Sequence, residues 1–370
     1  MAPNEGALFG GGMGALREKM QKIWQALGDQ AFDTTDEAKL RAFVAQTVAT
    51  FNVSERAFGN ISDTFQRFDF DGNGRLEFNE ACQCVKFVLV EHRRELGGAS
   101  FSRVPHKTPT EVGCELIRVL AAGGQGEARL VRVGECGREM CLKVYQRGNE
   151  NAGGLDELVQ EMRHLQRVAS CEHIGHCQEI FQDEDCFYML GDYFSGGDFV
   201  SLRTNLCAAG VALNEEFYRR IFKQVFQGLE YMHQQALMHC DIKEPNLMLK
   251  TSEYSRPEAV IIDLGLSQVL FDGLGACGSP GYIPPETWET EKWYPRGDIF
   301  SMGVVCFQLF ADMVPSGEKE GLFTEGAKDL DDVMRITETR QPPYEMMEFT
   351  GPSVMEWLGG GARDERGGGA

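Results

Sequence analysis

No uninterrupted apolar run in the 370 residues approaches the roughly 20 residues that a membrane-spanning helix needs. The first residues, MAPNEGALFGGG, also lack the basic start and the apolar stretch of a secretory signal. These two absences predict a cytoplasmic protein with no membrane anchor. In such a protein, the 12 cysteines are better interpreted as reduced thiols than as disulfides.

Positive charge is scarce. The chain has 36 Lys and Arg against 56 Asp and Glu, which gives a formal net charge of −20. This balance argues against nucleic acid as a partner and suits calcium or basic peptides. The length and the 42% hydrophobic content indicate a sizeable core and more than one domain.

Polar residues of several kinds gather in the stretch 239–249, which reads HCDIKEPNLML. Asp241 is followed by Lys243 and Asn246, and a short apolar run ends this stretch. A helix is predicted before it, because apolar residues recur there at helical spacing. These residues are Phe217, Ile221, Phe222, Val225, Phe226 and Leu229. A β-branched run, AVIIDLG, follows and carries a second acid, Asp263.

These motifs and their spacing resemble the catalytic loop and the metal-binding motif of the eukaryotic protein kinases. The resemblance implies that Asp241 orients the attacking hydroxyl and that Asn246 and Asp263 hold Mg²⁺. Lys243 would face the charge on the transferred phosphoryl group, and a lysine at this place is similar to the Ser/Thr kinases.

Further motifs with the same resemblance precede this stretch. The segment LAAGGQG resembles the glycine loop that covers ATP, with Gly123 and Gly126 in place and Ala121 where the first glycine belongs. In the strand-like segment EMCLKVY, Lys143 corresponds to the lysine that anchors ATP. Glu161 is its expected partner, and Glu157, one helical turn earlier, competes for that role.

The segment FYMLGDYFSGGDF resembles the last strand of the small lobe and the hinge. The resemblance implies that the backbone from Asp192 to Phe194 meets adenine and that Asp198 reaches the ribose. Gly191 falls at a position usually filled by a bulkier side chain, so either a cavity lies behind the adenine or neighbouring groups fill the space. The Cys and His residues of Cys171–Cys177 suggest zinc ligands, but the resemblance places them in an ordinary loop.

The segment 263–286 resembles the activation segment, and Asp298 resembles the acid that supports the catalytic loop. Cys240 replaces the arginine that commonly precedes the catalytic aspartate. The family also has an arginine that pairs with the acid at Glu286, and Arg366 is a loose candidate.

The segment 69–80, DFDGNGRLEFNE, matches the calcium loop of an EF-hand, with a glycine at the sharp turn and an acid that closes the shell. The predicted ligands are Asp69, Asp71, Asn73, Arg75 through its carbonyl group, Glu77 and Glu80. EF-hands usually pair. The segment Asp33–Val44 is one candidate for a degenerate partner loop, and an unrelated helical connector is the other interpretation.

Together these patterns predict an α+β two-lobed protein kinase fold preceded by an all-α EF-hand region. The predicted divisions are a helical region at 1–98, a linker at 99–115, a kinase domain at 116–358 and a Gly-rich tail at 359–370. The chain resembles the calcium-dependent protein kinases, although their EF-hands usually follow the kinase domain. The expected ligands are ATP, Mg²⁺ and Ca²⁺, and the expected partners are protein substrates, including basic ones. The alternative is a pseudokinase that acts as a calcium-responsive interaction protein, an interpretation based on Ala121, Cys240 and the short C-terminal part.

Overall fold

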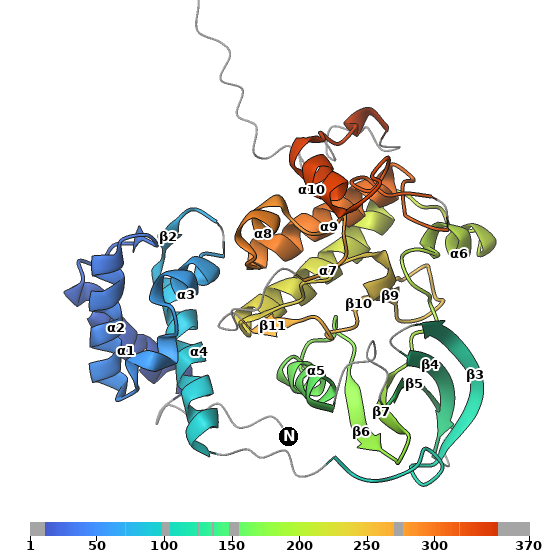
Figure 1. Ribbon diagram of the computed structural model, residues 1–370, viewed down its shortest axis with the longest axis horizontal. Coiled ribbons are helices and arrows are strands. Elements are labelled where there is room, and N and C mark those ends of the chain that lie inside the picture. The colour runs from blue at the N-terminus through green and yellow to red at the C-terminus, as the bar shows by residue number, and fades with distance from the viewer. Residues whose placement is uncertain are drawn as a thin grey trace, which may run out of the picture.

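A computed structural model describes residues 12–70, 72–97, 104–123, 126–134, 137–147, 155–269, 277–317 and 319–346, without the side chains of 12–14, 90, 91, 93–97 and 155–157. Figure 1 shows a helical N-terminal region at the left, a β-sheet at the lower right and a mainly helical part above the sheet. The expected two-lobed α+β architecture is confirmed. No helix among the described residues combines the length and the apolar character that crossing a membrane requires.

The N-terminal region consists of two helix–loop–helix units. The elements of the first unit are α1 (Gly12–Ala26), β1 (Phe32–Asp33) and α2 (Glu37–Phe51). After the short 3₁₀ helix η2 (Glu55–Phe58), the second unit has α3 (Ile61–Phe68), β2 (Arg75–Leu76) and α4 (Phe78–Gly97). The helices η2 and α3 do not join into one helix, because Gly59 has a φ of +57° and the side chain of Asn60 caps α3.

The segment Asp33–Val44 is mainly helical. Residues from Glu37 onward form helix α2, which Asp36 caps, so of the two interpretations of this segment, the one as a loop is excluded. Instead, β1 pairs antiparallel with β2, with Phe32 opposite Leu76. The loop that faces 69–80 therefore lies between α1 and α2.

A five-stranded antiparallel sheet forms the smaller lobe, in the order β3-β4-β5-β7-β6. Its strands are β3 (Cys114–Gly123), β4 (Gly126–Val133), β5 (Arg138–Gln146), β6 (Cys177–Gln182) and β7 (Cys186–Asp192). Helix α5 (Leu155–Arg167) packs against β6. Part of the predicted linker runs along the sheet edge, where the amide of Lys107 donates to the carbonyl of Gln182 at 2.8 Å.

Helix α7 (Glu215–Gln234) is the long buried helix of the larger lobe, and the residues predicted at helical spacing are buried or partly buried. The same lobe contains α6 (Leu202–Ala208), α8 (Pro285–Thr290), α9 (Pro295–Phe310), α10 (Leu330–Thr339) and η4 (Tyr344–Met346), and α9 packs against α7. Short strands and a 3₁₀ turn frame the site: β8 (Leu237–Met238), η3 (Glu244–Asn246), β9 (Leu247–Leu249), β10 (Ala259–Ile261) and β11 (Gln268–Val269).

The N-terminal region and the larger lobe share one apolar cluster. Besides the aromatic core of α1–α4, this cluster contains five buried residues of the larger lobe. They are Ala236, Met238, Cys240, Ile283 and Trp293. The side chain of Lys292 also forms an ion pair of 2.7 Å with Asp63 of α3. The helical region is therefore packed against the lobe that carries the catalytic loop.

Candidate active site

The turn between β8 and β9 brings the predicted catalytic residues together. The Nζ atom of Lys243 lies 2.8 Å from Oδ2 of Asp241. The Nδ2 atom of Asn246 donates to the carbonyl oxygen of Asp241 at 2.8 Å and to its Oδ2 at 3.0 Å. The side chains of Lys243 and Asn246 therefore fix the position of the Asp241 carboxylate, which is buried.

Asp298, at the start of α9, fixes the backbone of this loop. Its two carboxylate oxygens accept hydrogen bonds from the amides of His239 and Cys240, both at 2.9 Å. His233 and Trp293 contact the same carboxylate through ring nitrogens, at 2.8 and 3.2 Å. Burial raises the pKa of Asp298, but the His233 hydrogen bond and nearby charge outweigh it and leave the pKa below its usual value. The sequence predicted Asp298 but not His233, which lies at the end of α7 without a motif of its own.

Lys143 on β5 joins two acids from different elements. Its Nζ atom lies 3.2 Å from Oε1 of Glu161 on α5 and 3.4 Å from Oδ1 of Asp263. Burial alone lowers the pKa of Lys143, but the two carboxylates raise it well above its usual value. The Lys143 ammonium group in turn lowers the pKa of Asp263, whereas burial raises that of Glu161. Glu161 is thus the described partner of Lys143, and the side chain of Glu157 lies outside the described residues.

The backbone around Gly126, the last glycine of the glycine loop, leaves no room for a side chain. Gly123 and Gly126 face each other at the end of the β3–β4 pair, and residues 124–125 lie outside the described residues. A Cβ atom at Gly126 would lie 2.2 Å from the carbonyl oxygen of Val144, and its φ is +145°. A side chain at Gly126 is therefore incompatible with this backbone.

The predicted hinge residues begin at the last residue of β7, and the carboxylates among them contact other protein groups. The carboxylate of Asp192 contacts Arg138 at 3.1 Å and His176 at 3.0 Å. Asp198 accepts hydrogen bonds from the amide and the hydroxyl group of Ser201, at 2.9 and 2.7 Å. The adenine role of Asp192 and Phe194 and the ribose role of Asp198 stay predictions.

The close approach of a neighbouring backbone explains why a glycine occupies position 191. A Cβ atom there would lie 2.8 Å from the carbonyl oxygen of His176. The backbone of a neighbouring segment thus fills the space, which favours the second of the two interpretations of this glycine.

The Cys and His residues of Cys171–Cys177 are used in other contacts. His176 pairs with Asp192, and Cys177 lies 3.7 Å from the carbonyl oxygen of Glu179. In the part of the chain that the structure describes, no group of three or more His, Cys, Asp or Glu residues could hold a metal ion.

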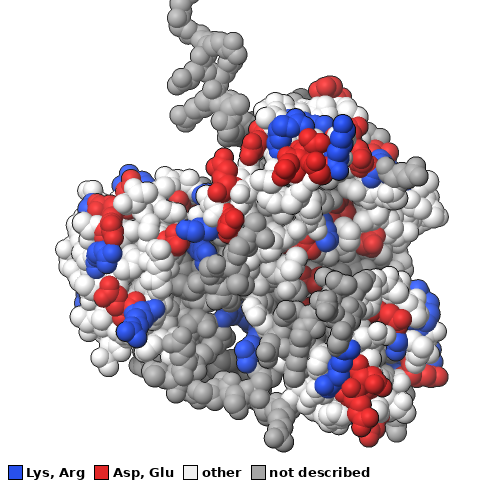
Figure 2. Space-filling model, viewed as in Figure 1, with Lys and Arg blue, Asp and Glu red and all other residues white. Residues whose placement is uncertain are grey.

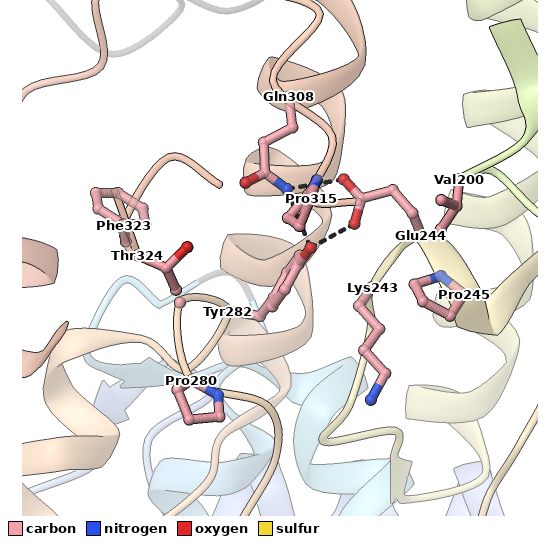
Figure 3. Close-up of a pocket in the computed structure, with 11 residues that line it drawn as sticks. Val200, Lys243, Glu244, Pro245, Pro280, Tyr282, Gln308, Pro315, Phe323 and Thr324 are labelled. Carbon is pink, nitrogen blue, oxygen red and sulfur yellow. Dashed lines mark hydrogen bonds between the residues drawn. The ribbon is translucent and has the colours of Figure 1, made fainter. Parts of the chain in front are cut away.

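The end of the activation segment is bound to the catalytic loop. The hydroxyl group of Ser279 donates to Oδ1 of Asp241 at 2.7 Å and accepts from Nζ of Lys243 at 2.7 Å. The Tyr282 hydroxyl group donates to buried Glu244, and Gln308 donates to the same carboxylate (Figure 3). Burial raises the pKa of Glu244. A pocket of about 280 Å³ opens here, between Lys243, Pro280 and Phe323.

Glu286 has a partner that the sequence did not indicate. The Nε atom of Arg296, in the first turn of α9, lies 3.1 Å from Oε1 of Glu286. Arg366, the candidate from the sequence, lies outside the described residues. Arg296 lies ten residues after Glu286, and the packing of α8 beside the start of α9 brings the two side chains together.

The 69–80 loop positions some of its predicted ligands around a turn. The carboxylate of Asp69 accepts hydrogen bonds from the amides of Asn73 at 3.0 Å and Gly74 at 2.8 Å. Glu80 accepts from the amides of Phe70 at 2.9 Å and Glu77 at 2.8 Å. Asp69 and Glu80 are both buried. Asp71, another predicted ligand, lies outside the described residues.

The arrangement of Lys143, Glu161, Asp241, Asn246 and Asp263 agrees with a comparison to known proteins. The protein kinase domain family matches residues 114–357 of the chain, more than half of its length. The chain belongs to the protein kinase family. This kinase is similar to the SNF1-related protein kinase catalytic subunit alpha KIN12 of Arabidopsis thaliana, with 28% identity over 255 residues. The match covers 61% of this chain and 50% of that protein, so the chain spans about half the length of this curated relative.

Proposed function

We propose that this kinase transfers the γ-phosphoryl group of ATP to Ser or Thr hydroxyl groups of protein substrates. The observation that carries the proposal is that one site contains both halves of the required chemistry. Lys143, Glu161 and Asp263 form one connected group, and Asp241, Lys243 and Asn246 form the other. Phosphoryl transfer depends mainly on such positioning and charge neutralisation.

Each residue has a distinct task in this proposal. Asp241 accepts the hydrogen bond of the attacking hydroxyl group, in the place where the Ser279 hydroxyl group now donates. Lys143 positions the nucleotide phosphates under Gly123 and Gly126, while Lys243 neutralises charge on the transferred group. The backbone from Asp192 to Phe194 meets adenine, and Asp198 meets the ribose.

The residues present fit a magnesium ion. Asn246 uses its amide nitrogen for Asp241, and Asp263 keeps a low pKa, so both residues offer oxygen atoms of the kind that Mg²⁺ prefers. When bound, the ion neutralises charge on the phosphate groups. The pseudokinase alternative depends on Ala121 and Cys240, and the connected acid and lysine groups favour catalysis over it.

We also propose that calcium regulates this activity through the 69–80 loop, as in the calcium-dependent protein kinases. The loop would bind Ca²⁺ with Asp69, Asp71, Asn73, the Arg75 carbonyl group, Glu77 and Glu80. Sensor EF-hands open a helix pair when calcium binds. In this chain such a change would act on contacts that lead directly to the active site.

Two contacts and one close approach support this route. Asp63 of α3 pairs with Lys292, which precedes α9. A Cβ atom at Gly72, inside the loop, would lie 4.0 Å from the side chain of Arg296, the partner of Glu286. Phe87 of α4 lies under the guanidinium group of Arg167, at the end of the helix that carries Glu161.

Glu80→Gln is expected to weaken calcium binding by about tenfold or more, because the closing ligand loses its charge and its bidentate mode. Calorimetry on the full chain measures this directly. Glu37→Gln is the matched control, since Glu37 is a well-exposed acid on α2 that forms a surface ion pair with Arg41. Equal calcium affinity in the Glu80 variant and the control would exclude the 69–80 loop as the site.

The route to the active site is tested by exchanging charges across the contact between Asp63 and Lys292. Asp63→Lys and Lys292→Asp are each expected to shift the calcium concentration of half-maximal response roughly two- to fivefold, as a partly exposed ion pair allows. The double variant should return toward the wild-type value, because the pair is restored with reversed polarity. A double variant that is no closer to wild type than the single variants would count against this route.

We propose protein substrates as partners, including basic ones, and a cytoplasmic location. In the view of Figure 2 the acidic and basic side chains are interspersed on the described surface. The selection of a basic substrate would therefore depend on acids close to the site. The boundaries 1–98, 99–115, 116–358 and 359–370 stay the proposed division of the chain.

A further inference from the structure

Two cysteines from different segments meet behind the catalytic aspartate. Cys240 immediately precedes Asp241 and belongs to an apolar cluster against which Cys277 of the activation segment packs, and each thiol group shifts the pKa of the other. The two backbones also approach closely, since a Cβ atom at Gly278 would lie 2.5 Å from the carbonyl oxygen of Cys240. Both cysteines are in the reduced form.

The surroundings of the two thiol groups differ. The Cys277 sulfur accepts a hydrogen bond from Nε2 of Gln268 at 3.0 Å, and its side chain is partly exposed. The neighbouring Cys240 thiol group and the Gln268 hydrogen bond lower the pKa of Cys277. Cys240 is fully buried, and burial raises its pKa well above the usual value. Because the thiolate is the reactive form, Cys277 is the one that meets an oxidant first.

We propose that Cys240 and Cys277 form a reversible disulfide site, which hydroperoxides oxidise and which links the catalytic loop to the activation segment. In the first step, the Cys277 thiolate attacks a hydroperoxide oxygen, becomes a sulfenic acid and releases an alcohol, or water from hydrogen peroxide. In the second step, the Cys240 sulfur attacks the sulfenic sulfur and releases water. In total, two thiols and one hydroperoxide give one disulfide, one alcohol and one water. A dithiol reverses the reaction by thiol–disulfide exchange.

The disulfide would act on the catalytic geometry through neighbouring residues. Its two sulfur atoms must come together to a bond length of about 2.05 Å. Cys240 adjoins Asp241, and Cys277 lies two residues before Ser279, whose hydroxyl group lies 2.7 Å from Asp241. A displacement of about 1 Å in such a site can cost on the order of 10²-fold in rate. We therefore expect oxidation to lower phosphoryl transfer by roughly tenfold or more.

The test treats the full chain with hydrogen peroxide and maps disulfides by mass spectrometry without reduction. The expected result is a linked peptide pair that contains Cys240 and Cys277, with activity that falls and then returns on treatment with dithiothreitol. Each variant is normalised to its own reduced activity. Cys277→Ser should lose the response to peroxide, whereas Cys207→Ser, at an exposed cysteine of α6, should retain it.

The disulfide mapping uses the wild-type chain, so its result does not depend on whether a variant folds. It is also independent of the proposed function, whereas the activity measurement rests on that function. Oxidation of other cysteines without the Cys240–Cys277 link would overturn the proposal. A Cys277→Ser variant whose activity is as sensitive to peroxide as that of the wild type would also overturn it. So would complete formation of the Cys240–Cys277 disulfide with no change in activity.

Discussion

Asp241→Asn is expected to lower phosphoryl transfer by about 10²–10⁴-fold, the usual cost of removing a positioned acid–base group. Oδ1 of Asp241 accepts the Ser279 hydroxyl group at 2.7 Å, and Oδ2 is held by Asn246 and Lys243. An asparagine keeps the size of the side chain but places an NH₂ group near Lys243 or near the substrate hydroxyl group. The measurement is the initial rate of phosphate transfer to a generic basic protein.

Nucleotide affinity and thermal stability separate chemistry from folding in this experiment. ATP binding should change little, because Lys143, Glu161 and Asp263 are not altered. Asp312→Asn serves as the control, since Asp312 is an exposed acid in surface ion pairs with Arg203 and Lys319. If the Asp241 variant kept most of the wild-type rate, the assignment of the catalytic loop would be wrong.

Asp298→Ala is expected to lower the free energy of unfolding by about 3–5 kcal/mol, the range seen when one partner of a buried charged pair is removed. The Asp298 side chain is fully buried and accepts from two loop amides, His233 and Trp293. Its removal leaves these buried donors without an acceptor and releases the loop before Asp241. The activity should therefore fall together with the stability.

Urea denaturation of the wild type and of Asp298→Ala at neutral pH measures the difference in their free energies of unfolding. Glu18→Ala removes an exposed acid of helix α1 that pairs with Lys22, so it serves as the control and should cost no more than about 1 kcal/mol. The pKa of Asp298 is below its usual value in the folded state. Its contribution is therefore present above the ordinary pKa of about 3.9 and is lost as the pH falls through the lower folded value. A loss as small as that of the control would mean that Asp298 does not hold the loop.

The sequence predicted the parts of the site whose spacing is local. Asp241, Lys243 and Asn246 lie in one turn, and a single motif is enough to bring them together. The pair of Lys143 and Glu161 could be predicted only through the resemblance, because a sheet and a helix must pack before these side chains meet.

Contacts between distant segments escaped prediction for the same reason. The pairing of Glu286 with Arg296 depends on how α8 and α9 pack, and neither residue lies in a pattern that indicates the other. The strand pair of Phe32 with Leu76 joins two loops that share no sequence motif. Cys240 shows the limit most clearly. Its sequence position suggested a missing arginine, whereas its surroundings are an apolar cluster shared with the helical region and a second thiol group.

The most direct test of the account measures transfer of the labelled γ-phosphate of ATP to a basic protein by the full chain, with calcium and with a chelator. The wild type should transfer phosphate at rates that differ between the two conditions, and Asp241→Asn should transfer almost none in either. Equal wild-type rates with and without calcium would contradict the regulation. A wild-type rate no higher than that of Asp241→Asn in both conditions would contradict the catalytic assignment itself.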